Sequence, residues 1–166
     1  MGSYNTKPIR KLDFEGYKIF VFNQNLANNL PAWDNSYEAG SSFKATKNSL
    51  SHVGKFYENY NNAGAALVAE KGEVGALHYG PFINVEPGTY TVTFDIAISP
   101  SSDGAARLDV ARGGQKILAE TTLMNNTSPY QLSFTLDKSS TIEFRVWSLG
   151  NASVIFRSVR IIKNPN

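Results

Sequence analysis

Few residues in the sequence carry the chemistry of catalysis or metal binding. The chain has two histidines, His52 and His78, and no cysteine. Zinc sites need three or four nearby ligands, and no third ligand accompanies these histidines, so a shared metal site is disfavoured. We expect His52 to lie in a polar loop and His78 on the surface of a sheet. Because serine-nucleophile, phosphate-binding and metal-binding motifs are also missing, we predict neither a metal site nor catalytic residues.

Paired carboxylates are the remaining route to catalysis, since a glycosidase requires only two of them about 5–10 Å apart. Asp95 and Asp109 are predicted on the outward faces of strands that could be neighbours, and Glu70 and Glu73 flank a turn at Gly72. Each pair is more simply interpreted as a solvated surface pair. We therefore do not expect an enzyme.

Binding chemistry is better represented, because one predicted strand turns a tryptophan outward. Between residues 140 and 148 apolar and polar residues alternate, and successive side chains of a strand point to opposite faces. If Phe144 and Val146 face the core, Trp147 faces outward. An exposed apolar ring with polar neighbours is typical of a binding site, and planar Arg and Asp groups form paired hydrogen bonds with hydroxyl groups. The predicted ligand site on this sheet face consists of Trp147, Arg145, Asp95, Asp109 and Arg107.

Three alternatives to this sheet-face site remain open. The aspartates and arginines could simply pair with each other across strands. The N-terminal segment from Tyr17 to Phe22 could cover Trp147. A β-bulge before Trp147 would turn its ring into the core.

Turn signals divide most of the chain into short alternating segments, which is typical of an antiparallel sandwich or barrel. The clearest strand runs from Thr89 to Ile98 after a Pro-Gly turn. A hairpin with a two-residue turn is predicted at Gly113-Gly114, and a further strand pair over residues 130–136 and 141–148. The closing strand is expected over residues 154–162. We predict an all-β fold, a two-sheet antiparallel β-sandwich of jelly-roll type. Its predicted core consists of Tyr90, Val92, Phe94, Ile96, Leu108, Val110, Ile142, Phe144 and Val146.

Two segments of the sequence are similar to each other, residues 82–97 and 134–148. Each contains a short strand, a polar turn and a longer alternating strand. This similarity indicates two sheets built from similar hairpins. Further strands are expected at residues 17–22, 42–46 and 65–70.

Composition limits the class of protein. A chain of 166 residues and 18.2 kDa has the size of one domain. The net charge is +2 and charged residues make up 18%, without a basic patch, so we expect no nucleic-acid partner. The apolar runs are too short for membrane insertion. A surface rich in neutral polar residues suits a secreted or cell-surface module, and the start Met1-Gly2-Ser3 lacks signal-peptide features, so we expect any export signal to lie elsewhere.

The stretch GPFINVEPGTYTVTFDIAI, from Gly80 to Ile98, resembles the central hairpin of carbohydrate-binding modules with the galactose-binding-like β-sandwich fold. ARLDVARGGQKI, STIEFRVWS and SVIFRSVRI follow in the order of the later strands of that family. The resemblance covers residues 38–163 and leaves residues 1–37 as an N-terminal extension with one or two strands packing on the sandwich. It implies non-catalytic binding of an oligosaccharide or polysaccharide by one module of a larger protein.

The resemblance also implies a common ligand site in the loops at the sandwich edge. The segment Phe56–Asn62 places Tyr57 and Tyr60 among amide side chains, which makes both candidate ligand contacts. Trp33, in a turn after Pro31, is a third candidate. The alternative is that Phe56 and one tyrosine pack beneath the loop as a small hydrophobic cluster.

Calcium-bearing members of the resembled superfamily place an acidic residue in the closing strand, next to a Glu near the start of the domain. This sequence has Glu38 near the start, but Arg157 stands where the acid is expected. A cation is not a ligand for calcium, so we predict no structural calcium and no cofactor.

Two other classes of function compete with glycan binding. The first is a structural or protein-binding sandwich domain, as in adhesins. The second is an enzyme acting on glycans, for which Asp95 and Asp109 would be the carboxylates.

Overall fold

The structure of the protein, a computed structural model, describes residues 10–14, 17–21, 41–126 and 130–166. These residues form β-strands and one 3₁₀ turn, η2 (Tyr60–Asn62). The strands are β1 (Arg10–Phe14), β2 (Tyr17–Val21), β3 (Ser42–Lys44), β4 (Lys55–Tyr57), β5 (Ala66–Ala69), β6 (Val74–His78), β7 (Ile83–Val85), β8 (Gly88–Ile98), β9 (Ala106–Arg112), β10 (Lys116–Leu123), β11 (Tyr130–Leu136), β12 (Ser140–Leu149) and β13 (Val154–Lys163).

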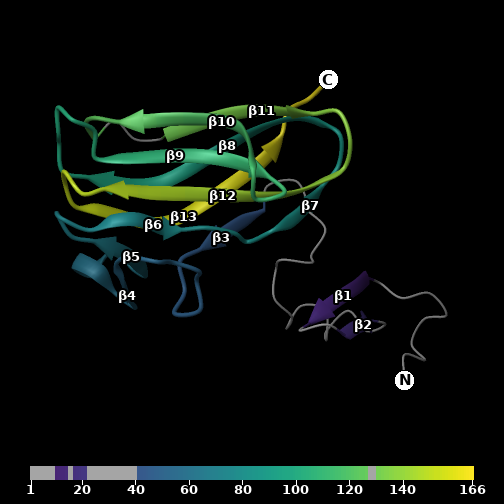
Figure 1. The fold of residues 1–166 in the computed structure, drawn as a ribbon, viewed down its shortest axis with the longest axis horizontal. Coiled ribbons are helices and arrows are strands. Elements are labelled where there is room, and N and C mark those ends of the chain that lie inside the picture. Colours follow the sequence, from purple (N-terminus) through teal and green to yellow (C-terminus); the bar gives the residue numbers. More distant parts are fainter. Residues whose placement is uncertain (1–9, 15–16, 22–40, 127–129) are drawn as a thin grey trace.

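Two antiparallel sheets stack as a sandwich (Figure 1). The five-stranded sheet has the order β10-β9-β12-β6, with β7 also paired to β12. The six-stranded sheet has the order β11-β8-β13-β5-β4, with β3 also paired to β13. The predicted all-β, two-sheet antiparallel sandwich is confirmed. Among the residues that the structure describes, we find no helix with the length and hydropathy of a membrane span.

Most connections between successive strands cross from one sheet to the other. The similar segments 82–97 and 134–148 are therefore not hairpins, and that prediction was wrong. In each segment the short strand and the long strand lie in different sheets, and the partners are exchanged between segments: β7 pairs with β12, and β11 pairs with β8. The polar turns between them are corners of the sandwich. The local sequence predicts such a turn, but it does not indicate which of the two sheets the next strand joins.

The β9–β10 hairpin is formed as predicted, although its turn has three residues, Gly113, Gly114 and Gln115, instead of two. Gly113 and Gly114 have φ angles of 61° and 73°, in the left-handed region that favours glycine. On its other side β9 pairs with β12, and the polar cluster described below lies on these two strands.

The core fills the space between the two sheets, because the inward residues of β8, β9 and β12 alternate with polar ones. All the core residues predicted from the sequence are at most 2% exposed. Tyr90 shows how a polar atom is accommodated: its ring stacks on Phe134, while its hydroxyl donates to the Glu86 carbonyl at 2.8 Å.

The N-terminal strands β1 and β2 pair with each other in a two-stranded antiparallel sheet. Neither forms a ladder with the described strands of the sandwich. That this extension packs on the sandwich stays a prediction. Trp33 lies outside the described residues.

Candidate functional site

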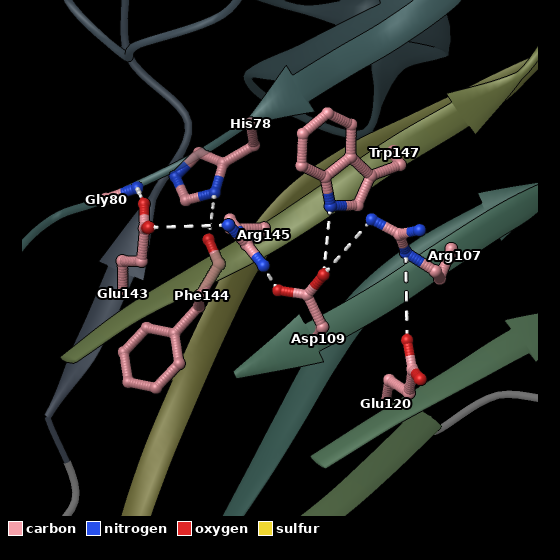
Figure 2. Close-up of polar contacts among 9 residues, drawn as sticks. All are labelled: His78, Gly80, Arg107, Asp109, Glu120, Glu143, Phe144, Arg145 and Trp147. Carbon is pink, nitrogen blue, oxygen red and sulfur yellow. Dashed lines mark hydrogen bonds and ion pairs between the residues drawn. The ribbon is translucent and has the colours of Figure 1, made fainter. Parts of the chain in front are cut away.

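Strands β9 and β12, two central strands of the five-stranded sheet, carry the centre of the polar cluster drawn in Figure 2. In their register Arg145 lies opposite Asp109, and Trp147 lies opposite Arg107. Directly opposed residues on one face of a sheet are close enough for their side chains to interact. The fold therefore gathers these four predicted site residues on the outer face of the five-stranded sheet.

Asp109 is the centre of this cluster. Its Oδ1 accepts a hydrogen bond from Arg145 Nε at 2.5 Å, and its Oδ2 accepts one from Trp147 Nε1 at 3.0 Å. Arg107 Nη2 lies 3.5 Å from the same Oδ2. With two hydrogen-bond donors and the Arg107 cation around it, the carboxylate is 0% exposed, so it orients its neighbours and does not itself face a ligand. The predicted role of Asp109 as a direct ligand contact is corrected on this ground.

The Trp147 ring lies against both guanidinium groups. The central carbon of Arg107 is 5.0 Å from the ring centroid, and that of Arg145 is 5.4 Å away, both within cation–π range. The ring is half-buried and faces outward as predicted. A bulge does occur here, but it lies in β6, where Ala76 pairs with Trp147 and His78 pairs with Val146. The pairing of β12 with β9 is continuous, so the tryptophan keeps its outward direction.

Arg107 forms the exposed rim of the cluster, with 36% of its side chain accessible. Its Nε is buried and has no hydrogen-bond partner among the described residues, although Glu120 Oε2 lies 4.0 Å away. Glu120, on β10 opposite Asp109, was not predicted from the sequence. The reason is a bulge at Leu118. The extra residue interrupts the alternation of β10, so counting every second residue along the sequence does not identify the side chains that face outward.

Glu143 extends the cluster toward the β6–β7 connection. Its Oε1 is 3.7 Å from Arg145 Nη1, and its Oε2 accepts the Gly80 backbone N–H at 3.3 Å. Burial raises the pKa of this carboxyl above its ordinary value, partly opposed by the charge of Arg145. Arg145 therefore bridges two carboxylates, one on its own strand and one on β9. Its pair with Asp109 is the cross-strand pairing that the first alternative described.

Asp95 does not belong to this cluster, and its predicted place beside Asp109 was wrong. It lies on β8 in the six-stranded sheet, opposite Ser158, and is exposed. The two aspartates are on different sheets because the β8–β9 connection crosses the sandwich. They therefore do not form the close carboxylate pair that a glycosidase requires.

The other acidic pair stabilises a turn. Glu73 accepts backbone N–H bonds from Glu70 at 2.7 Å and from Gly54 at 3.1 Å. These bonds, that from Glu70 foremost, lower the pKa of the Glu73 carboxyl. A carboxylate used in this way is a structural anchor for the β5–β6 connection.

The two loop tyrosines lie at the edge of the other sheet. Tyr57 ends β4, the edge strand, and is exposed, whereas Tyr60 in η2 is half-buried. Their ring centroids are 5.1 Å apart. Phe56 is partly buried and packs against the core, beneath the outer pair formed by Tyr57 and Tyr60. The ligand role of the two tyrosines stays a prediction.

His78 lies in the core, and its predicted place on a sheet surface was wrong. The β6 bulge sets it opposite the inward-facing Val146, and it is 5% exposed. Its ring centroid is 4.3 Å from that of Phe156 in the other sheet, and its Nδ1 donates to the Phe144 carbonyl at 3.0 Å. Burial lowers the pKa of the imidazole from 6.5 to about 4, because the charged ring would lose its water.

We expect His78 to make the protein less stable in mild acid. An unfolded histidine binds a proton below pH 6.5 and the folded one only near pH 4, so the free energy of unfolding falls as the pH drops through this interval. The full loss is roughly 3 kcal/mol. Urea denaturation at several pH values measures it. His78→Asn, which retains a hydrogen-bond donor, should reduce the change of the free energy of unfolding with pH. His52→Asn, at the exposed histidine, should leave that change as it is in the wild type. Parallel curves for wild type and His78→Asn would contradict the prediction.

Solved structures with the same arrangement of two sheets provide a comparison. The C-terminal CBM6 domain of the marine laminarinase LamC from Zobellia galactanivorans has a TM-score of 0.51 and 17% identity, covering 74% of this chain and all of that domain. This chain therefore shares the β-sandwich fold of that domain. The module of Cellvibrio mixtus lichenase 5A solved with cellotriose is also similar, with a TM-score of 0.48 and 15% identity over 75% of this chain and 98% of its own.

A larger enzyme contains a similar segment. A family GH115 4-O-methyl-α-glucuronidase with specificity for decorated arabinogalactans has a TM-score of 0.50 and 10% identity. The similarity covers 93% of this chain but 20% of that enzyme. No protein-family model matches the sequence, and no curated protein matches it. The fold that this chain shares with these domains is therefore recognised from the three-dimensional structure.

Proposed function

We propose that this domain is a non-catalytic glycan-binding module, and that the outer face of its five-stranded sheet is the binding site. The observation that carries the proposal is the half-exposed Trp147 ring, fixed by its hydrogen bond to the buried Asp109 and flanked by two guanidinium groups. The similarity to carbohydrate-binding modules supports the same function.

Each part of the cluster suits one part of a sugar. A pyranose ring presents a face of C–H groups, which packs on an aromatic ring, and a rim of hydroxyl groups, which hydrogen-bond to guanidinium and carboxylate groups. Trp147 supplies the ring. Arg107 and Glu120, the two accessible charged side chains, supply donors and acceptors at its edge. Because Asp109 holds Arg107, Arg145 and Trp147 from below, little side-chain freedom is lost when a ligand binds.

The charges of the cluster favour a neutral glycan. Two arginines, Arg107 and Arg145, lie among three carboxylates, those of Asp109, Glu120 and Glu143. A carboxylate or sulfate on the ligand would add negative charge to a face whose cations are already paired. Uncharged hydroxyl groups use the free donors without this repulsion.

Titration of the whole domain with laminarin, cellotriose and arabinogalactan tests the proposal, with binding followed by calorimetry and tryptophan fluorescence. Trp33→Phe makes Trp147 the single tryptophan, because the chain has two. We expect at least one of these glycans to bind and change the Trp147 emission. Trp147→Ala should weaken binding at least about thirtyfold, since aromatic anchors contribute about 2 kcal/mol or more. Trp147→Phe retains an aromatic ring and should therefore lose less glycan affinity than Trp147→Ala.

Matched variants at the edge loop separate the two predicted sites. Tyr57→Ala and Tyr60→Ala should leave the affinity unchanged if the sheet face binds the glycan. Loss of binding in these variants, with full binding in Trp147→Ala, would move the site to the loop. Absence of binding to all three glycans would contradict glycan recognition and favour a structural or protein-binding domain.

The proposed context is a secreted or surface protein in which this module accompanies other domains. Charged residues make up only 18% of the chain, and a similar segment lies within a much larger glycan-active enzyme. In that context the module would hold its partner domain at the polysaccharide. The separation of Asp95 from Asp109 on different sheets supports a non-catalytic role.

A further inference from the structure

Four backbone carbonyl groups surround the guanidinium group of Arg157. Its Nη1 donates to the oxygens of Ala63 and Gly64, both at 3.0 Å, and to that of Ala65 at 3.5 Å. Its Nη2 donates to the oxygen of Tyr60 at 3.2 Å. A single side chain thus collects the carbonyl groups of one loop, which we call the carbonyl cradle.

A β-bulge aims Arg157 at this loop. In the pairing of β13 with β8, Phe156 lies opposite Ile96 and Ser158 lies opposite Asp95, so Arg157 is the extra residue between them. Bulges redirect a side chain that would otherwise follow the alternation of the strand. The Arg157 carbonyl is also bonded, by the Ala45 N–H at 2.7 Å, which fixes the bulged backbone.

The loop is shaped so that its carbonyl groups converge. Asn61, Asn62 and Gly64 have φ angles of 54°, 57° and 87°, in the left-handed region. Tyr60 N–H donates to the Gly64 carbonyl at 2.9 Å, and Gly64 N–H donates to the Asn59 side chain at 3.1 Å. Left-handed residues cost free energy unless surrounding contacts hold them, and Arg157 supplies four such contacts.

The cradle has the chemistry of a hard-cation site. Backbone carbonyl oxygens are common ligands of calcium, and in the described part of the chain no carboxylate lies within ion-pair distance of Arg157. A calcium ion does not fit beside the guanidinium, which occupies these oxygens and carries a like charge. No three His, Asp or Glu side chains gather elsewhere among the described residues to hold a metal.

We infer that Arg157 is a built-in cation that fills a metal-like carbonyl cradle, so that the loop of residues 59–65 is held without calcium. The inference goes beyond glycan binding and does not rest on it. Its consequence is that Arg157, through the Tyr60 carbonyl, holds Tyr60 in the place where its ring meets that of Tyr57. Removing the guanidinium should empty the cradle, and supplying a carboxylate at the same position should convert it into a calcium site.

Thermal denaturation and amide hydrogen exchange, both without glycan, test this inference. The wild-type melting temperature should be the same in EDTA and in calcium chloride. Arg157→Ala should lower it and speed exchange in the 59–65 loop. Arg157→Lys retains the charge but not the planar guanidinium group, so its melting temperature and loop exchange rate should lie between those of the wild type and Arg157→Ala. Arg157→Asp should be unstable in EDTA and regain about 5 °C or more in calcium chloride, since a ligand that binds only the folded state raises its stability.

Arg160→Asp is the matched control, because it makes the same charge change at an exposed position of the same strand. We expect no calcium response from it. Stabilisation of the wild type by calcium, wild-type loop exchange in Arg157→Ala, or an Arg157→Asp domain equally unstable with and without calcium would each overturn the inference. Glycan affinity enters none of these measurements, so they fail or succeed independently of the proposed function.

Discussion

Replacing Asp109 by alanine is expected to lower the free energy of unfolding by about 3–5 kcal/mol, the range for removing one partner of a buried ion pair. The physical reason is that Asp109 is fully buried, while Arg145 beside it is 12% exposed. Without the carboxylate, a nearly buried guanidinium and the Trp147 N–H lose their acceptor. Under the proposed function, glycan binding should be lost as well, because the ring and both arginines lose their common support.

Urea denaturation at pH 7 measures this effect, and two variants locate its cause. Asp109→Asn keeps the size of the side chain but turns an amide N–H toward donors, so it should also be destabilised. The double variant Asp109→Leu/Arg145→Met removes both partners of the central ion pair and should recover part of the lost stability, since apolar residues often replace a buried ion pair at little cost. The recovery should be incomplete, because Glu143 loses the Arg145 charge and the Trp147 N–H still lacks its acceptor. A loss of less than about 1 kcal/mol in Asp109→Ala would contradict this account of the cluster.

Replacing Phe94 by alanine is expected to cost a similar 3–5 kcal/mol, the typical loss for a buried phenylalanine. Phe94 is 0% exposed on β8, where it lies opposite Val159 of β13 and Tyr130 of β11. The ring is held by neighbours on both sides, so the cavity left by its removal can collapse only in part.

Asp95→Ala is the matched control, one residue farther along the same strand. Asp95 is exposed, and surface substitutions of this kind usually change stability by less than about 0.5 kcal/mol. Denaturation of the two variants side by side compares the inner and outer faces of β8. Equal losses would contradict the assignment of Phe94 to the core.

The sandwich class and much of its core could be predicted from the sequence, because they depend on local alternation. The period of two in β8, β9 and β12 determines which side chains share a face, whatever the strand pairs with. The same local rule turned Trp147, Arg145, Arg107 and Asp109 outward, and these residues do share the outer face of one sheet.

What alternation could not provide was the choice of partner strand and the place of each bulge. Asp95 and Asp109 are both outward residues, yet they lie on different sheets because the connection between their strands crosses the sandwich. Bulges in β6 and β10 brought His78 into the core and Glu120 beside Arg107. A bulge adds one residue to a strand, so every later side chain of that strand points to the opposite face of the sheet from the one that simple alternation predicts. The position of the bulge depends on the pairing with the neighbouring strand.

The sequence by itself determined an all-β sandwich with an outward tryptophan among arginines and an aspartate. Only the tertiary structure decided that Asp109 is buried beneath Arg145, Trp147 and Arg107, and that Arg157 reaches four carbonyl groups of a distant loop. Burial and hydrogen-bond partners depend on residues that lie 36 or more positions away in the chain, and no local pattern encodes them.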